Sequence, residues 1–373
     1  QTIVNSNVDF LVVGEGEETF LELVEALAQK QPVSGIKGIW FKEAGNIRGN
    51  PLRPVVDMDS EPPLSYHLID IQTHIMWLSG RRALQFETSR GCPFRCAFCY
   101  NTSVRLGQWR ALTAPTALRR LKQLVDEYNI RAFAFSDDNF FTDPGRARDI
   151  LQGIIRSKLD IVWGKGDIRL DLLAQLDDDF LKLIRDSGCL SLVIGVESGS
   201  QRIANLLRKE IDVSRAITVN RRLAAHSIDP RYLFLVGIPG ETEDDVQQTA
   251  DMMLALTREN PRATVAVQIF VPYPGTELFD LAVQSGLQAP QKLEDWIYFS
   301  WSNRSLDYPW ISRDRKQMVR MLSFCSYFLA RHNSKTFGRV PKLVSLLGAL
   351  YRPIARARLQ RGFYWFSPEL WLA

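Results

Sequence analysis

Short apolar runs alternate with longer amphipathic stretches through most of the chain. Six runs have the length and the β-branched, aromatic or leucine content of buried strands, and they cover 84–88, 132–136, 161–166, 190–196, 232–237 and 265–271. The stretches between them repeat apolar residues with helical spacing, and they cover 114–128, 146–157, 177–187, 213–226, 243–257 and 276–285. Strands that alternate with helices predict an α/β fold with a parallel sheet and right-handed crossovers.

The first 50 residues follow another pattern. A buried strand at 9–13 leads through Gly14-Glu15-Gly16-Glu17-Glu18 into a helix that ends near Ala28, and a hairpin with its turn at 44–46 follows. The two glycines are typical of a nucleotide loop, but the three glutamates would repel phosphates, so we reject that interpretation. Prolines then punctuate 51–80, which predicts a linker. Because the chain begins with Gln1 rather than Met, we expect a piece of a longer protein.

Charge is distributed unevenly between the two ends. Residues 301–373 contain 13 Lys/Arg against 3 Asp/Glu, a net charge of +10 within a chain whose total is +4. This tail is also rich in aromatic residues, but its uncharged runs are shorter than the ~20 residues that span a bilayer. A helical cap over the core and a peripheral contact with a membrane surface both fit the pattern. Three of the five cysteines share one loop, which favours a reducing cytoplasm over a disulfide framework.

That loop reads Cys92-Pro93-Phe94-Arg95-Cys96-Ala97-Phe98-Cys99. Three thiolates on one loop can ligate three irons of a cubane cluster, and with no fourth cysteine nearby one iron stays open to a substrate. A structural zinc loop is the main alternative. Zinc is usually held by four ligands from two paired motifs, and no second Cys or His pair follows in the sequence. Cys189 and Cys325 have no partner spacing and are interpreted as core residues.

The C-x3-C-x-aromatic-C pattern resembles the cluster loop of the radical S-adenosylmethionine (radical SAM) enzymes. The resemblance implies a 4Fe-4S cluster held by Cys92, Cys96 and Cys99, S-adenosylmethionine (SAM) bound at the open iron, and a partial six-stranded (β/α)6 barrel. It also implies an electron donor such as flavodoxin or ferredoxin. The predicted organisation is an N-terminal unit at 1–50, a linker at 51–80, the core barrel at 81–290 and a helical extension at 291–373.

Further matches to this family follow the predicted strands. Asp137 and Asp138 come after the second strand, and the resemblance implies that they bind the SAM amino group, as suits a carboxylate facing an ammonium. Arg169, after the third strand, would face the SAM carboxylate. Glu197 and Ser198, in Gly-Val-Glu-Ser-Gly-Ser after the fourth strand, would also contact SAM. The alternatives are a helix cap for the aspartates, a structural ion pair for Arg169 and an N-cap for the serine.

Two more residues complete the predicted cofactor site. Phe98 is the aromatic residue inside the cysteine motif, and Gly237 opens Gly-Ile-Pro-Gly-Glu-Thr after the fifth strand, which resembles the family's turn beside the adenine. No catalytic side chain is predicted. The matches stand in the same order as in the family over about 190 residues, which is more specific than any one of them alone.

The strand and helix at 9–28 resemble the end of the cobalamin-binding domain that precedes many radical SAM barrels. The resemblance implies cobalamin-dependent methylation of an unactivated carbon, with a small-molecule, lipid or tetrapyrrole substrate. A cobalamin-independent enzyme and an oxidative ring cyclase stay open, as does a non-catalytic iron–sulfur or zinc scaffold. No cobalt-ligand motif is found. No additional three-cysteine domain or RNA-binding barrel is recognisable either, so nucleic acid is not an expected partner.

Overall fold

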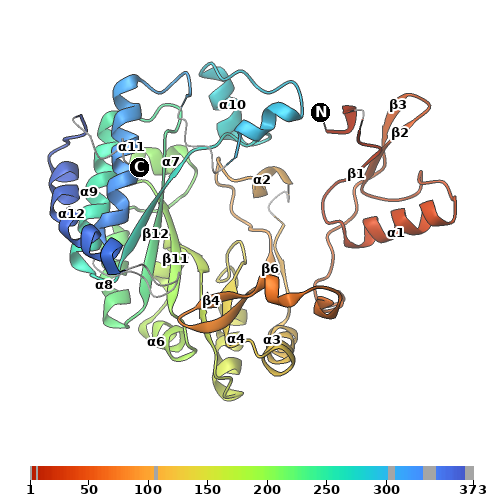
Figure 1. Cartoon of the computed structure of the whole chain (residues 1–373), viewed down its shortest axis with the longest axis horizontal. Coiled ribbons are helices and arrows are strands. Elements are labelled where there is room, and N and C mark those ends of the chain that lie inside the picture. The colour runs from red at the N-terminus through yellow and green to blue at the C-terminus, as the bar shows by residue number, and fades with distance from the viewer. Residues whose placement is uncertain (1, 6, 105–107, 301–306, 331–341, 366–373) are drawn as a thin grey trace.

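The computed structural model describes the chain except for residues 1, 6, 105–107, 301–306, 331–341 and 366–373 (Figure 1). Figure 1 shows a small N-terminal unit set to one side of a larger α/β unit, with the C-terminal helices against the far side of the larger unit. The described residues also form short 3-10 turns at Thr2–Val4, Tyr66–Leu68, Ile71–His74 and Glu294–Tyr298.

The N-terminal unit is a three-stranded antiparallel sheet covered by one helix. Its elements are β1 (Phe10–Val12), α1 (Glu17–Ala28), β2 (Ile39–Glu43) and β3 (Asn46–Gly49). Leu23 from the helix packs on Ile39 and Phe41 of the sheet and forms a small core of its own. The predicted strand, helix and hairpin are therefore confirmed.

The larger unit contains the six predicted parallel runs. Its strands are β4 (Met76–Leu78), β5 (Arg81–Phe86), β8 (Ala132–Phe135), β9 (Val162–Gly164), β10 (Gly166–Arg169), β11 (Ser191–Glu197), β12 (Asp229–Val236) and β13 (Thr264–Ile269). They form the sheets β4-β5-β8-β9 and β10-β11-β12-β13, in which every pair is parallel except β4 with β5. β4 lies within the range predicted as linker. The sequence did not predict this strand, because three residues are too few to show an alternating pattern.

The third predicted strand divides into β9 and β10 at Lys165. This residue has a left-handed backbone with φ of 60°, which L-residues rarely adopt and which interrupts a strand. A parallel bridge between Trp163 and Cys189 continues the pairing from one sheet to the other. The two sheets therefore follow one curved, barrel-like wall.

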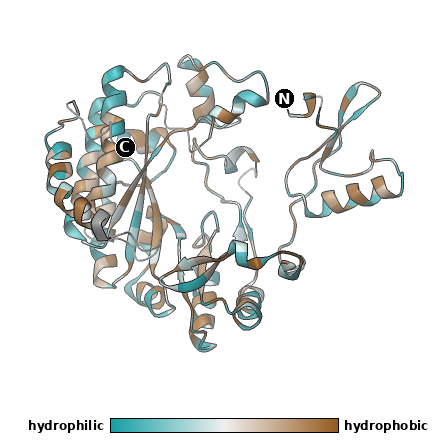
Figure 2. Ribbon diagram, in the orientation of Figure 1, coloured by the Kyte–Doolittle hydropathy of each residue, from teal (hydrophilic) through white to brown (hydrophobic). Residues whose placement is uncertain are grey.

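Helices cover the outside of this wall. The six predicted helices are confirmed as α3 (Ala114–Tyr128), α4 (Pro144–Arg156), α6 (Asp178–Asp186), α8 (Arg215–Ala225), α9 (Glu243–Glu259) and α10 (Glu277–Gln284). Two short helices follow strands. α5 (Leu170–Gln175), which the sequence pattern did not indicate, begins directly after β10, and α7 (Gln201–Leu206) begins a few residues after β11. Figure 2 shows hydrophobic strands at the centre and mixed colouring along the surrounding helices, as expected for amphipathic helices packed on a buried sheet.

The C-terminal segment packs on the same core. α11 (Arg313–Leu329) lies against β13 and α9, and α12 (Lys342–Gln360) lies against α9 and α11. Ala355, Leu359 and Tyr364 are buried in the main hydrophobic cluster. The described residues of this segment are thus largely helical and pack on the core. No helix in the described part of the chain is long and apolar enough to cross a membrane.

Candidate functional site

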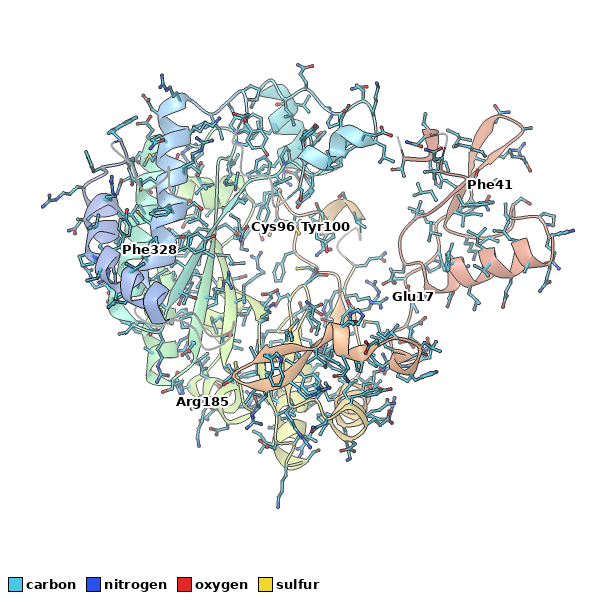
Figure 3. The ribbon with its side chains drawn as sticks, viewed as in Figure 1. Glu17, Phe41, Cys96, Tyr100, Arg185 and Phe328 are labelled. Atoms are coloured by element: carbon cyan, nitrogen blue, oxygen red, sulfur yellow. The ribbon has the colours of Figure 1, made fainter. Side chains whose placement is uncertain are left out.

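The cysteine loop begins where β5 ends. A two-residue ladder of β6 (Ser89–Arg90) and β7 (Arg110–Ala111) leads into it, and the short helix α2 (Asn101–Val104) follows it. Gly91 has φ of 80°, and a Cβ there would lie 1.9 Å from the Gln108 carbonyl oxygen. Only glycine fits this position, so Gly91 sets the direction in which the chain runs from the sheet into the cysteine loop. Figure 3 shows Cys96 between the strands of the barrel and the N-terminal unit.

The three motif thiols share a partly dry environment. Cys96 is buried, Cys92 and Cys99 are half-buried, and the Cys99 amide donates to the Cys96 carbonyl at 3.1 Å. Burial raises the pKa of the Cys92 thiol and raises the pKa of Cys99 to about 11, and the neighbouring thiols contribute further. Three thiolates on one loop repel one another, and metal binding compensates their charge by displacing the protons.

The donor set suits a cluster by its chemistry. Three cysteines of one loop, in the spacing C-x3-C-x2-C, offer the thiolate ligands that iron–sulfur clusters use, whereas a structural zinc site takes four donors, usually in paired motifs. In the described residues, no three His, Cys, Asp or Glu side chains are placed to hold a metal ion, so the fit rests on the motif and on the chemistry of its thiolates. Cys92, Cys96 and Cys99 would hold the implied cluster.

Arg169 reaches this loop from the end of β10. Its Nη1 donates to the Cys96 sulfur at 3.3 Å, and its guanidinium lies 3.8 Å from the centre of the Phe94 ring. Nε donates to Asp171 at 2.9 Å, and Nη2 donates to the Lys209 carbonyl oxygen. The structure therefore shows the ion pair that was one of the two alternatives for Arg169, and adds a contact with sulfur. An N–H directed at a cluster sulfur stabilises the reduced state.

A buried ion pair lies beside Arg169. Lys209 Nζ donates to Glu197 Oε1 at 2.7 Å, and the two residues are 5% and 9% exposed. Burial opposes the charge on Lys209, but Glu197 and Cys96 outweigh it and raise the pKa of the lysine. Glu197 has φ of 69° at a register shift between β11 and β12, and backbone strain of this kind persists where a site requires it.

Lys209 is the site residue that sequence reasoning missed. It follows α7 within Leu-Leu-Arg-Lys-Glu and carries no motif. The only signal is its place one short helix after Glu197, which is too weak to separate it from a surface lysine. Gly195 marks the crowding there, because a Cβ at that position would lie 2.5 Å from Glu197 Oε1 and 2.8 Å from Lys209 Nζ.

The two predicted aspartates hold the cysteine loop in this structure. Asp137 is 1% exposed and accepts hydrogen bonds from the Thr88 hydroxyl at 2.6 Å and the Ser89 hydroxyl at 2.5 Å. Burial raises its pKa, against the lowering effect of these hydrogen bonds. Asp138 accepts from the Gly91 amide at 2.8 Å. Their oxygens are engaged by the strand end and the loop, so the structure gives them a supporting role that the motif alone did not reveal.

The remaining predicted residues differ in what they contact. Ser198 is fully buried, and its hydroxyl bonds the Thr249 hydroxyl at 3.2 Å and the Ser200 amide at 3.0 Å. It anchors a turn to α9, so a cofactor contact predicted for its side chain has no support here. Gly237 has φ of 80° and donates its amide to Glu241 at 2.7 Å. Phe98 lies 5.9 Å from the Lys209 ammonium, beside the Glu197–Lys209 pair.

Ion pairs connect the N-terminal unit to the cysteine loop. Glu15 pairs with Arg110 and with Arg90, the latter at 3.2 Å, and Glu17 pairs with Arg90 at 2.5 Å. Glu17 is seen on the N-terminal unit in Figure 3. A cavity of about 520 Å³ lies at this junction and is lined by Gly14 to Glu17 and by both arginines. Two of the three glutamates that argue against a nucleotide loop, Glu15 and Glu17, thus bind the β6–β7 ladder beside Cys92.

Comparison with known proteins agrees with this geometry. The family model of the radical SAM superfamily matches residues 86–253. An uncharacterized methyltransferase of Pyrococcus horikoshii is 32% identical over 282 residues, which cover 75% of this chain and 59% of that protein. The chain belongs to the radical SAM superfamily. The curated relatives that it matches include methyltransferases and magnesium-protoporphyrin cyclases.

Two other relatives extend the comparison. The anaerobic magnesium-protoporphyrin IX monomethyl ester cyclase of Rubrivivax gelatinosus is 24% identical, over 73% of this chain and 48% of that protein. The solved structure of apo OxsB, described as a cobalamin-dependent S-adenosylmethionine radical enzyme, superimposes with a TM-score of 0.68 at 19% identity, over 96% of this chain and 57% of that one. The chain thus spans about half the length of the proteins it matches. The likeness to OxsB shows the fold alone.

Proposed function

We propose that this radical SAM protein cleaves SAM reductively at a 4Fe-4S cluster ligated by Cys92, Cys96 and Cys99. The observation that carries the proposal is the contact of Arg169 with the sulfur of the buried Cys96, beside the buried Glu197–Lys209 pair. When bound, the cluster and SAM together supply a 5′-deoxyadenosyl radical, which abstracts hydrogen from a substrate. We further propose that a small electron-transfer protein of the flavodoxin or ferredoxin type supplies the electron.

The residues of the chain would bind and orient SAM and would exclude water from the site. The carboxylate of Glu197 suits an ammonium group, and the ammonium of Lys209 suits a carboxylate, so the pair matches the two ends of an amino acid. Arg169, pinned by Asp171 and the Lys209 carbonyl oxygen, would keep its N–H on the Cys96 sulfur. Burial of Cys96 and packing of Phe94 and Phe98 around these cations would keep water from the open corner.

For the reaction outcome, we propose cobalamin-dependent methylation of an unactivated carbon in a small-molecule, lipid or tetrapyrrole substrate. The methyltransferase relative and the cobalamin-dependent description of OxsB support it. The cavity of about 520 Å³ that is lined by residues of both the N-terminal unit and the segment around the cysteine loop would be the place for a cofactor shared by the two units. An oxidative cyclisation is the second candidate, supported by the Rubrivivax cyclase.

The first test is anaerobic reconstitution with iron and sulfide, followed by SAM and dithionite. The wild-type chain should bind about four irons and release 5′-deoxyadenosine. Cys96→Ala should lose both, whereas Cys325→Ala, the same change at a buried thiol of α11, should keep both. Activity that survives in Cys96→Ala would refute the assigned ligand, and iron content without SAM cleavage in the wild type would favour a scaffold.

The second test addresses cobalamin. The full-length protein, purified anaerobically, should carry a corrinoid that is visible in its absorption spectrum and released on denaturation. A corrinoid-free protein that still cleaves SAM and modifies its substrate would overturn the cobalamin proposal while leaving the radical chemistry in place.

A further inference from the structure

The C-terminal segment contacts the end of β12 through one indole. Trp310 Nε1 donates to the Gly237 carbonyl oxygen at 2.9 Å, across 73 residues of sequence. Gly237 is the first residue after β12, and Trp310 lies three residues before α11. The segment that follows the barrel therefore supplies a side-chain hydrogen bond to one of the barrel's strand ends.

Other bonds hold the same turn. Gly237 has φ of 80°, and its amide donates to the buried carboxyl of Glu241 at 2.7 Å. Arg315, on α11, donates to the carbonyl oxygens of both Glu241 and Trp310. Because a glycine in this conformation is free to adopt many others, these bonds are what keep the turn at 237–241 in one shape.

Ring contacts fix the direction of the indole. The Tyr308 ring is stacked on Trp310, with centroids 4.7 Å apart and planes 5° apart, and the Phe270 ring lies 6.5 Å away. Both residues of the stacked pair belong to the hydrophobic cluster that contains Ile238 of the turn and Phe98 of the cysteine motif. Turning the N–H away from Gly237 would break these contacts, so the indole is held in its bonding orientation.

The turn borders the proposed SAM site. Glu197, at the end of β11, is in register with Phe234 of the neighbouring parallel strand β12, so Gly237 follows at the same rim of the barrel. Ligands of parallel α/β folds bind at this rim, where the strands end. In the proposed function, Glu197 and Lys209 bind the amino-acid end of SAM. The turn at Gly237 is then the adjacent wall of the same site.

We infer that Trp310 is a positioning residue for SAM, because its N–H holds the Gly237 turn in the shape that receives the cofactor. The inference rests on the proposed function. Trp310 lies outside residues 86–253, which the family model matches, so the C-terminal segment adds this element to the site. A turn that is ordered before SAM arrives lowers the cost of binding.

The test compares Trp310→Phe, which keeps a ring for stacking and removes the N–H, with Trp365→Phe, the same change at an indole that is 53% exposed. In the reconstituted chain, Trp310→Phe should raise the Kd for SAM in equilibrium dialysis about fivefold, the loss expected for one neutral hydrogen bond. The KM for SAM in 5′-deoxyadenosine release should rise equally, with kcat near the wild-type value. Trp365→Phe should behave like the wild type.

Hydrogen exchange gives a readout that does not depend on activity. Without SAM, peptides that contain 236–242 should exchange faster in Trp310→Phe than in the wild type, and SAM should slow them again. A residue that only fills space would lower the free energy of unfolding and leave both the Kd and this local exchange unchanged.

The outcomes separate the inference from the proposed function. If the wild type releases 5′-deoxyadenosine but Trp310→Phe binds SAM with the wild-type Kd, the positioning role is refuted and the radical chemistry stands. If Trp310→Phe fails to fold, Tyr308→Leu decides, since it removes the stacked ring and leaves the N–H: weaker SAM binding supports the inference, and wild-type binding refutes it. If the wild type binds no SAM, the proposed function falls and the inference falls with it.

Discussion

Asp137 offers a sharp test of how the cysteine loop is held. The motif predicts that its carboxylate binds the SAM amino group, whereas the structure shows it bonded to Thr88 and Ser89. In Asp137→Asn, an amide keeps the shape but not the charge, and its NH2 would face the Thr88 amide, which now donates to Oδ2 at 3.3 Å. Two short charge-assisted bonds would become neutral ones and one donor would face another, with a combined cost of about 3 kcal/mol.

Part of that cost is offset, because the buried carboxylate carries a desolvation penalty that the amide lacks, and this penalty is what raises the pKa of Asp137. We therefore expect Asp137→Asn to lower the free energy of unfolding by roughly 2–3 kcal/mol in urea titrations of the reconstituted protein. The exposed Asp149→Asn, on α4, should change it by less than about 0.5 kcal/mol. SAM affinity, measured below the denaturation threshold, should change little.

The opposite pattern would refute the reasoning. If Asp137→Asn unfolds like the wild type but binds SAM about tenfold more weakly, the carboxylate contacts the cofactor, and the hydrogen bonds to Thr88 and Ser89 are incidental. Thr88→Val provides an independent check, because it removes one donor without touching the carboxylate. It should destabilise the chain by about 1 kcal/mol.

Three further predictions follow from groups elsewhere in the fold. Burial raises the pKa of Glu241 to about 7, so the folded state binds the proton of this carboxyl more tightly than the unfolded state does. The proton therefore adds to the free energy of unfolding below pH ~4.5, and this contribution is lost as the pH rises through 7. Glu241→Gln should therefore flatten urea-derived stability over that window by up to about 3 kcal/mol, and an unchanged slope would contradict the shift. Lys209→Met leaves Glu197 buried without its partner, and should cost about 3 kcal/mol in the same assay and weaken SAM binding; normal values of both would remove the pair from the site. If the basic tail contacts membranes, the exposed apolar face of α12 is the contact. Leu350→Ser changes a side chain that is 65% exposed, and it should reduce co-sedimentation with anionic vesicles without lowering the free energy of unfolding. Unchanged co-sedimentation would exclude this face.

The membrane test uses a point substitution and not a deletion, and the reason is structural. From the sequence alone, 301–373 is one basic, aromatic tail, and deleting the whole tail would be the obvious experiment. The structure shows Ala355, Leu359 and Tyr364 in the main core, so the deletion would expose that core and confuse unfolding with loss of binding.

Much of the fold was predictable because its signals are local. The helices at 114–128 and 243–257 were placed within two residues of α3 and α9, since amphipathic spacing and the Thr242 cap are readable from neighbouring residues. β4 and α5 were missed. β4 is three residues long, and α5 follows β10 with no cap hydrogen bond from a side chain, so neither leaves a periodic pattern.

The candidate site also has a part that could be predicted from the sequence and a part that could not. The cysteine motif and the order of the strand-end segments were readable, because each is a short contiguous pattern and the patterns follow one another in a fixed order. The break at Lys165 was not, since it depends on how two sheets meet. The roles of Asp137 and Ser198 were not either, because motif resemblance says where a residue lies along the chain and not which neighbour occupies its oxygens.

The sequence by itself determined the alternation of strands and helices, the spacing of the three thiols, and hence the family. Only the tertiary structure decided that Arg169 contacts Cys96 across 73 residues, that Lys209 pairs with Glu197, and that Lys165 and Arg231 line one cavity. The physical reason is that periodicity and spacing act between near neighbours, whereas these contacts depend on strand register and on which charges burial forces together.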